Sequence, residues 1–141
     1  MKLNMDAMRD VMIFLEEHLV IDELEADNDF RVEFEENLIV NHFHNNYLEA
    51  DVIHVIHLLV LNDYLDAYET KGNNNNGWIT VTGITMKGYD LLTSIRNDTV
   101  YSKAKEFLVG MGVASVEILQ RVAMIVLQSY ISSQLPWVVG P

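Results

Sequence analysis

The chain has 141 residues, no cysteine, and 21 acidic against 9 basic side chains, which gives a formal net charge of −12. This length suits one domain with a hydrophobic core, and an apolar fraction of 50% is too high for an intrinsically disordered protein. The lack of cysteine excludes disulfide scaffolds, thiolate zinc sites and thiol nucleophiles. The first residues do not form a secretory signal, and polar residues interrupt the apolar stretch 122–141. We therefore expect a cytoplasmic protein with no membrane span.

The negative charge is concentrated in the first third of the chain. Residues 1–51 hold 14 acidic and 3 basic side chains, and ten of these acids lie between Glu16 and Glu36. Like charges at helical spacing repel one another, so a long helix is disfavoured there. We interpret residues 20–36 as a solvated acidic insertion.

Apolar periodicity predicts the first elements in chain order. A first amphipathic helix is expected over 4–19 with Asn4 as its N-cap, and a second over 48–61. Between them, the β-branched and aromatic residues of 37–43 predict a short strand that ends at an Asn-Asn turn.

A β-hairpin is expected next, because the β-prone runs 64–70 and 78–82 flank a loop rich in glycine and asparagine. Four residues of this hairpin should face inward. They are Leu65, Ala67, Ile79 and Val81.

Helices are predicted over 85–96 and 100–109, and Ser115 should cap a last helix of about 18 residues. The fold class is therefore α+β, mainly α. The order helix, strand, helix, hairpin matches a winged-helix-like module whose middle helix is shortened or lost. We expect this module over 1–97, a C-terminal helical extension over 98–135 and a tail over 136–141.

Four stretches of the chain carry a further signal: Met1–Asp10, Asp51–Leu59, Trp78–Leu92 and Ser94–Lys105. These stretches resemble an uncharacterised family of short phage and prophage proteins. The resemblance covers most of the chain except the acidic insertion and the tail after Leu135. The chain departs from the family pattern at Asn62-Asp63, where a small residue and glycine are usual, and at Tyr101, where tryptophan is frequent. The resemblance implies a winged-helix-like fold and a bacterial host, but it supplies no activity and no functional residues.

Direct DNA binding through the usual winged-helix face is disfavoured by charge. Residues 45–70 contain no Lys or Arg but five acids, whereas DNA binding relies on cations that neutralise phosphates. The cations elsewhere are too few to neutralise a DNA backbone. They are Lys71 and Lys87 near the hairpin, and Lys103 and Lys105 further along the chain. A regulator that binds DNA through a nonstandard face is kept as the alternative function.

Histidines provide a second alternative, a metal site. A strand would place His42 and His44 on one side, and a helix would do the same for His54 and His57. Facing one another, these four could bind zinc or a similar ion. Their spacing matches no specific metal motif, so we predict no metal or other cofactor.

Catalytic motifs are absent from the sequence: it has no phosphate-binding glycine loop, no Gly-x-Ser-x-Gly elbow and no His-Glu-x-x-His. We expect a non-enzymatic protein that acts through protein contacts. The last helix is apolar around its circumference near Val122–Leu127, which favours a homodimer. A basic protein partner is expected for the acidic segment. The residues predicted to make these contacts are Glu23, Glu25, Asp27, Asp29, Glu33, Glu35, Val122, Ile125, Val126 and Trp137.

Overall fold

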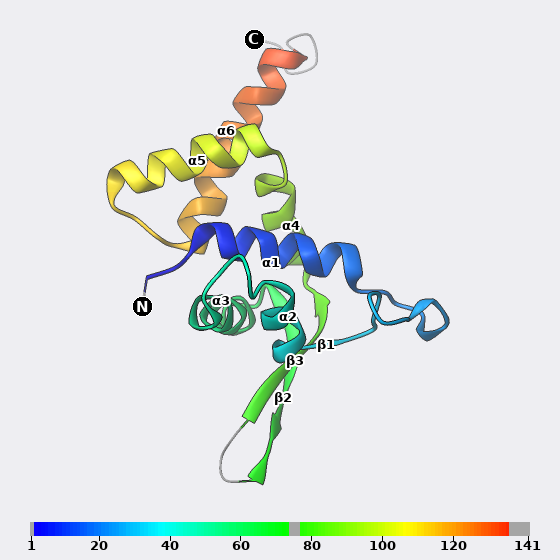
Figure 1. Ribbon diagram of the computed structural model, residues 1–141. Helices are drawn as coiled ribbons and strands as arrows, with labels where there is room; N and C mark the ends of the chain where they lie inside the picture. The colour runs from blue at the N-terminus through cyan, green and yellow to red at the C-terminus, as the bar shows by residue number, and fades with distance from the viewer. Residues whose placement is uncertain (1, 74–76, 136–141) are drawn as a thin grey trace. The chain divides into compact units, whose positions relative to one another are not determined.

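A computed structural model describes residues 2–73 and 77–135. These residues form an α+β fold that is mainly helical, with six α-helices, one 3-10 turn and a three-stranded antiparallel sheet (Figure 1). The predicted fold class is confirmed. The chain divides into two compact units, one within residues 3–89 and a second that begins at Asp90. Trp137 lies outside the described residues.

The first unit begins with helix α1, Met5–His18, as predicted. Asn4 caps it, because its side-chain oxygen accepts a hydrogen bond of 3.0 Å from the Ala7 amide. Its apolar stripe is buried and includes Met8, Val11 and Leu15. The chain then passes through the acidic loop, which we define as residues 20–33 and which contains the 3-10 turn η1, Glu23–Glu25.

The sheet has the strand order β1-β3-β2. Strand β1, Phe34–Glu35, pairs with β3, Gly77–Ile84, at Phe34–Val81 and Glu35–Thr80. Strand β2, Leu65–Lys71, pairs with the other edge of β3, and together they form a hairpin that projects away from the helices of its unit (Figure 1). Leu65 and Val81 are buried as predicted, and Ala67 and Ile79 are half-buried.

The prediction of a strand over 37–43 is wrong. This segment belongs to helix α2, Glu36–His42. Glu36, Ile39, Val40 and Phe43 are all buried, and they follow one another at the three- and four-residue steps of a helix. In a strand, the neighbouring side chains of Ile39 and Val40 would point to opposite faces of the sheet. The helix buries both of them, and this burial outweighs their preference for strands.

Helix α3, Glu49–Leu61, matches the prediction and ends at Asn62. Asp63 reverses the chain with a φ of 63°, in the left-handed region that Asp tolerates better than most residues. The chain then enters β2. Helix α4, Met86–Ile95, follows β3 and begins close to the turn at Asp63. Thr85 links the two, since its hydroxyl donates to the Asp63 carbonyl at 2.6 Å and accepts from the Gly88 amide at 3.0 Å.

The second unit contains the rest of α4 with helices α5, Asp98–Met111, and α6, Val116–Gln134. Asn97 caps α5, since its side chain accepts from the Val100 amide at 3.1 Å. Gly112 ends α5 in the left-handed conformation with a φ of 70°. Ser115 caps α6 as predicted. Helix α6 packs across α5, and its last turns extend beyond it (Figure 1).

Across residues 2–73 and 77–135, no helix combines the length and apolar character needed to cross a bilayer.

The closeness of α4 to the turn at Asp63 depends on Gly88. A Cβ atom at this position would lie 2.2 Å from the Tyr64 carbonyl oxygen, which is part of the backbone and cannot move freely. We expect Gly88→Ala to lower the free energy of unfolding by about 2 kcal/mol or more, because the clash forces a backbone shift. Urea denaturation measures this loss.

A matched control is Gly110→Ala in α5, where nothing lies within 4 Å of the added Cβ. This change should raise stability by up to about 1 kcal/mol, as expected for alanine in a helix. Equal effects at the two glycines would contradict the close contact at Gly88.

Candidate interaction surfaces

The two ends of the acidic loop are held together by backbone hydrogen bonds. The Arg31 amide donates to the His18 carbonyl at 3.0 Å, and the Val20 amide donates to the Arg31 carbonyl at 2.9 Å. Further along, the Asp27 carboxylate accepts from the Asp29 and Phe30 amides at 2.8 Å each. The loop is therefore a structured feature of the surface and not a loose connection.

The predicted acidic contact residues lie on or beside this loop. Glu23, Glu25, Asp27 and Asp29 are exposed within it, and Glu35 is exposed in β1. Glu33 is half-buried, and its carboxylate accepts a hydrogen bond of 2.8 Å from the Tyr68 hydroxyl of β2. Most of these carboxylates are therefore available to a partner.

Two of these contacts shift pKa values. The Phe30 and Asp29 amides stabilise the charged carboxylate of Asp27 and hold its pKa below the ordinary value. The hydrogen bond to Glu33 raises the pKa of the Tyr68 hydroxyl, because the carboxylate favours the protonated phenol.

A cluster of aromatic rings and histidines, which was not predicted from the sequence, supports the base of the loop. The rings of Phe14 and His18 stack with their centroids 4.4 Å apart, and Phe30 of the loop stacks on His18 at 5.5 Å. His42 lies 4.3 Å from Phe14 on another side. The spacing of Phe14 and His18 by one helical turn was the available signal.

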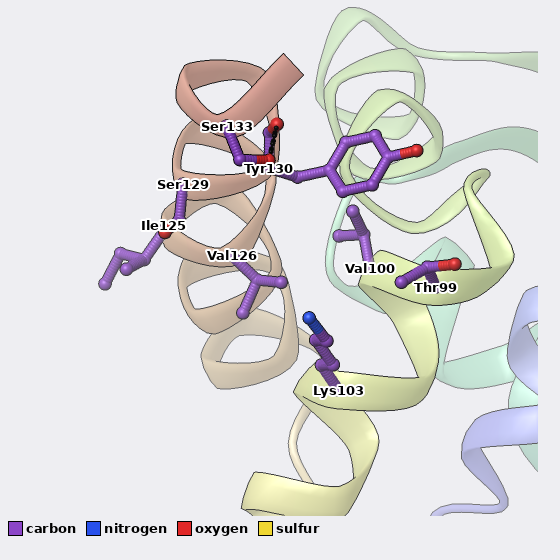
Figure 2. Close-up of a pocket in the computed structure, with 8 residues that line it drawn as sticks. All are labelled: Thr99, Val100, Lys103, Ile125, Val126, Ser129, Tyr130 and Ser133. Carbon is purple, nitrogen blue, oxygen red and sulfur yellow. Dashed lines mark hydrogen bonds between the residues drawn. The ribbon is translucent and has the colours of Figure 1, made fainter. Parts of the chain in front are cut away.

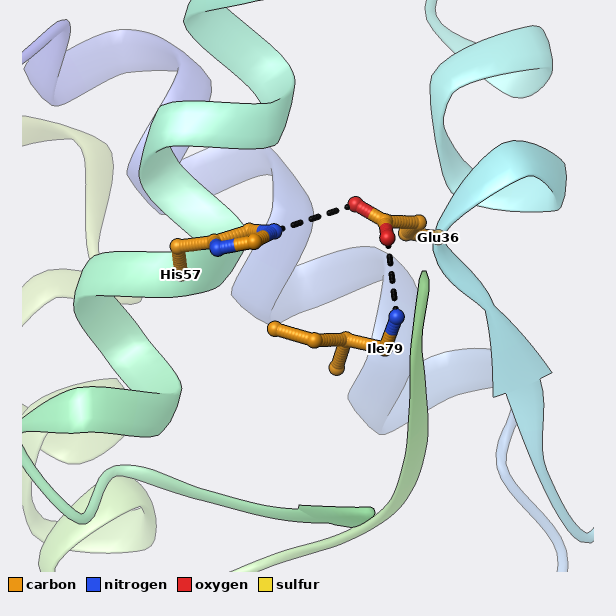
Figure 3. Close-up of polar contacts among 3 residues, drawn as sticks. All are labelled: Glu36, His57 and Ile79. Atoms are coloured by element: carbon orange, nitrogen blue, oxygen red, sulfur yellow. Dashed lines mark hydrogen bonds and ion pairs between the residues drawn. The ribbon is translucent and has the colours of Figure 1, made fainter. Parts of the chain in front are cut away.

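Glu36 joins three elements of the first unit (Figure 3). Its side chain is buried, one carboxylate oxygen accepts a hydrogen bond of 2.8 Å from the Ile79 amide of β3, and the other lies 3.2 Å from Nε2 of His57 in α3. A buried carboxylate is costly unless such partners surround it. Glu36 therefore fixes the start of α2 against β3 and α3.

The four candidate metal ligands do not come together. His42 lies in a helix and not in a strand, His44 donates from Nδ1 to the Asn41 carbonyl at 2.8 Å, and His57 pairs with Glu36. His54 is half-buried on α3. Among the residues that the structure describes, no three His, Asp or Glu side chains gather closely enough to hold a metal ion.

The surface around α3 and the hairpin has few cations. Lys87 is one of the few cations that could contact DNA phosphates near the hairpin. Its Nζ donates to the Asn62 carbonyl at 2.9 Å and lies 4.4 Å from the centre of the Tyr64 ring. It closes the C-terminus of α3, where a cation is favourable. Lys71 at the end of β2 is exposed.

Helices α5 and α6 form a cleft of about 360 Å³ with apolar walls and polar edges. Figure 2 shows Val126 and Tyr130 of α6 facing Val100 and Lys103 of α5 across this cleft. Ile125 also lines the cleft and is 67% exposed. Val122 is half-buried one turn earlier. Of the predicted apolar contact residues of α6, Ile125 and Val126 therefore line the cleft, and Val122 does not.

More apolar side chains of these two helices are exposed. Phe107 of α5 is 56% exposed and lines a second depression with Met111, while Met124 and Ile131 of α6 are also exposed. These residues add to the apolar side chains that both helices expose.

Comparison with known proteins identifies the family. The model of the family described as hypothetical protein (DUF2513) matches residues 2–114, which include the first unit, all of α5 and the turn after it. The chain belongs to this family. No curated protein and no solved structure matches the chain.

The role of Glu36 can be tested by two substitutions. Glu36→Ala leaves the Ile79 amide without its acceptor, so we expect the free energy of unfolding to fall by about 2 kcal/mol. Glu36→Gln keeps an acceptor oxygen and should lose less. Urea denaturation gives both values, and Glu35→Ala at the exposed neighbour should change stability by no more than about 0.5 kcal/mol. Equal losses for the two alanine variants would contradict the structural role of Glu36.

The turn at Asp27 should respond to pH. Because its pKa is lowered in the folded protein, the turn stabilises the loop above the ordinary aspartate pKa, and this contribution is lost as the pH falls through the lowered pKa. We expect the Phe30 amide proton to titrate in NMR spectra with a midpoint below the ordinary aspartate value. Asp27→Asn keeps an acceptor oxygen without the charge and should abolish this titration; an unchanged titration in that variant would exclude Asp27 as its source.

Proposed function

We propose that this protein is non-enzymatic and acts through contacts with other proteins, as a homodimer assembled through α5 and α6. The observation that carries this proposal is the exposed apolar surface of these two helices, above all Ile125 and Phe107. An interface of standard size buries about 800 Å² on each partner.

The distribution of charge supports a second copy as the partner of this surface. Residues 90–141 hold four acidic and four basic side chains, so this part of the chain has no net charge. Residues 1–89 hold 17 acidic and 5 basic side chains and carry the entire −12. Two copies can therefore approach through the neutral part with little repulsion, whereas contact between two acidic parts is opposed.

The acidic loop is proposed as the surface for a basic partner, such as a protein whose groove otherwise binds nucleic-acid phosphates. Its exposed carboxylates and ordered backbone support this role, because a fixed array of charges loses less entropy on binding than a flexible one. Such charges also accelerate association with a partner of opposite sign.

The scaffold is proposed to be winged-helix-like, with an origin in a phage or prophage and a location in the cytoplasm of the bacterial host. The order α1, β1, α2, α3, β2, β3 and the projecting hairpin support the fold assignment. The sequence motifs shared with short phage and prophage proteins support the origin. The absence of Lys and Arg from residues 45–70, together with the contacts of Lys87, favours protein contacts over DNA binding.

Light scattering coupled to size-exclusion chromatography tests the dimer. We expect the wild type to have twice the mass of one chain, and Ile125→Glu to shift it to a monomer because it places a charge in an apolar interface. Phe107→Glu should act in the same direction.

Leu61→Glu provides a matched control. Leu61 lies on α3 and is 78% exposed, but it is outside the proposed interface, so this variant should remain a dimer. A wild type that is monomeric at high protein concentration would refute self-association and would leave the acidic-surface proposal to be tested separately.

A further inference from the structure

An apolar groove lies beside the acidic loop in the first unit. Its volume is about 360 Å³. The end of α1 forms one wall through Leu19, the loop contributes Ile21 and Val32, and β3 contributes Thr82 and Ile84. Ile21 is fully exposed, so the loop presents an aliphatic side chain to solvent where an occupant of the groove could cover it.

The groove also borders an unpaired part of the sheet. Strand β1 pairs with β3 only at Val81 and Thr80, so β3 continues beyond this pairing through Thr82–Ile84. On the other edge, β2 changes register between Asp66 and Ala67, and this bulge leaves Thr82 without a partner residue in β2. An unpaired strand edge can bind an extended chain by backbone hydrogen bonds.

The electrostatic surroundings select the charge of that chain. Glu16 lines the groove, Glu17 and Asp22 flank it in sequence, and the rest of the acidic loop continues from there. A segment rich in Lys or Arg is attracted to this rim, whereas an acidic segment or a nucleic acid is repelled.

We propose that this groove binds an extended basic segment of a partner protein, with one aliphatic side chain of that segment inserted between Ile21, Val32 and Thr82. This inference rests on the proposed role of the acidic loop and names the kind of partner that the loop receives. The apolar contact supplies the position of the segment, and the surrounding carboxylates supply the preference for cations.

Three synthetic peptides test the proposal. The first has four lysines around a central leucine, the second replaces this leucine by serine, and the third has four glutamates around the leucine. We expect the lysine–leucine peptide to bind about tenfold more tightly than the lysine–serine peptide in fluorescence anisotropy, as burial of roughly half a leucine side chain predicts. The glutamate peptide should not bind. In NMR spectra the amide signals of Thr82 and Gly83 should shift on binding.

Variants of the full chain locate the site. Ile21→Ser should remove the preference for leucine over serine, and Leu24→Ser should retain it, because Leu24 is a similarly exposed aliphatic residue of the same loop outside the groove. Thr82→Lys at an exposed position should weaken binding of both lysine peptides by placing a cation in the groove. Circular dichroism verifies that each variant is folded.

The outcomes separate this inference from the proposed function. Equal binding of the leucine and serine peptides, or an unchanged preference in Ile21→Ser, would refute binding in the groove. Neither result would contradict the proposal that the acidic loop binds a basic partner. Equal binding of the lysine and glutamate peptides would overturn the charge selection on which the groove depends. Failure of every lysine peptide to bind would overturn both the groove and the acidic-surface proposal, while the dimer is decided independently by its mass.

Discussion

The buried carboxylate of Glu36 is the constraint on which the arrangement of the first unit depends. A charged group inside a protein requires partners, and Glu36 obtains them from the backbone of β3 and from His57 of α3. These contacts hold the start of α2 where β1 ends. They therefore also fix the position at which the acidic loop returns to the sheet.

Tyr47 adds a second link, because its hydroxyl donates to Asp10 of α1 at 2.5 Å. Burial raises the pKa of this phenol, and the hydrogen bond acts in the same direction.

Charged residues are distributed unevenly between the two parts of the chain. All of the net charge lies in residues 1–89, and the exposed apolar side chains of α5 and α6 lie in the neutral remainder. Strong net charge keeps one part of a protein apart from its own copies, while a neutral apolar surface is free to associate. The proposed homodimer and the proposed basic partner both depend on this separation of charge.

The ammonium group of Lys87 is engaged within the first unit. Lys87 lies near the hairpin, but its ammonium group is engaged at the C-terminus of α3 and above the Tyr64 ring. The proposed binding of a basic polypeptide rests on the carboxylates of the acidic loop and on the apolar groove beside them.

The sequence alone determined the elements whose signals are local. Asn4 and Ser115 cap helices where their side chains predict it, and the hairpin and α3 follow their apolar patterns, because capping and periodicity depend on residues within one or two turns. The segment 37–43 was mispredicted because its β-branched residues fit either a short strand or a helix, and only burial of Glu36, Ile39 and Val40 on one face decided for the helix. The pairing of Glu36 with His57, the closure of the acidic loop at Arg31 and the groove at Thr82 join residues distant in the chain. They were decided by the tertiary structure, because no local pattern specifies which buried group will meet which partner.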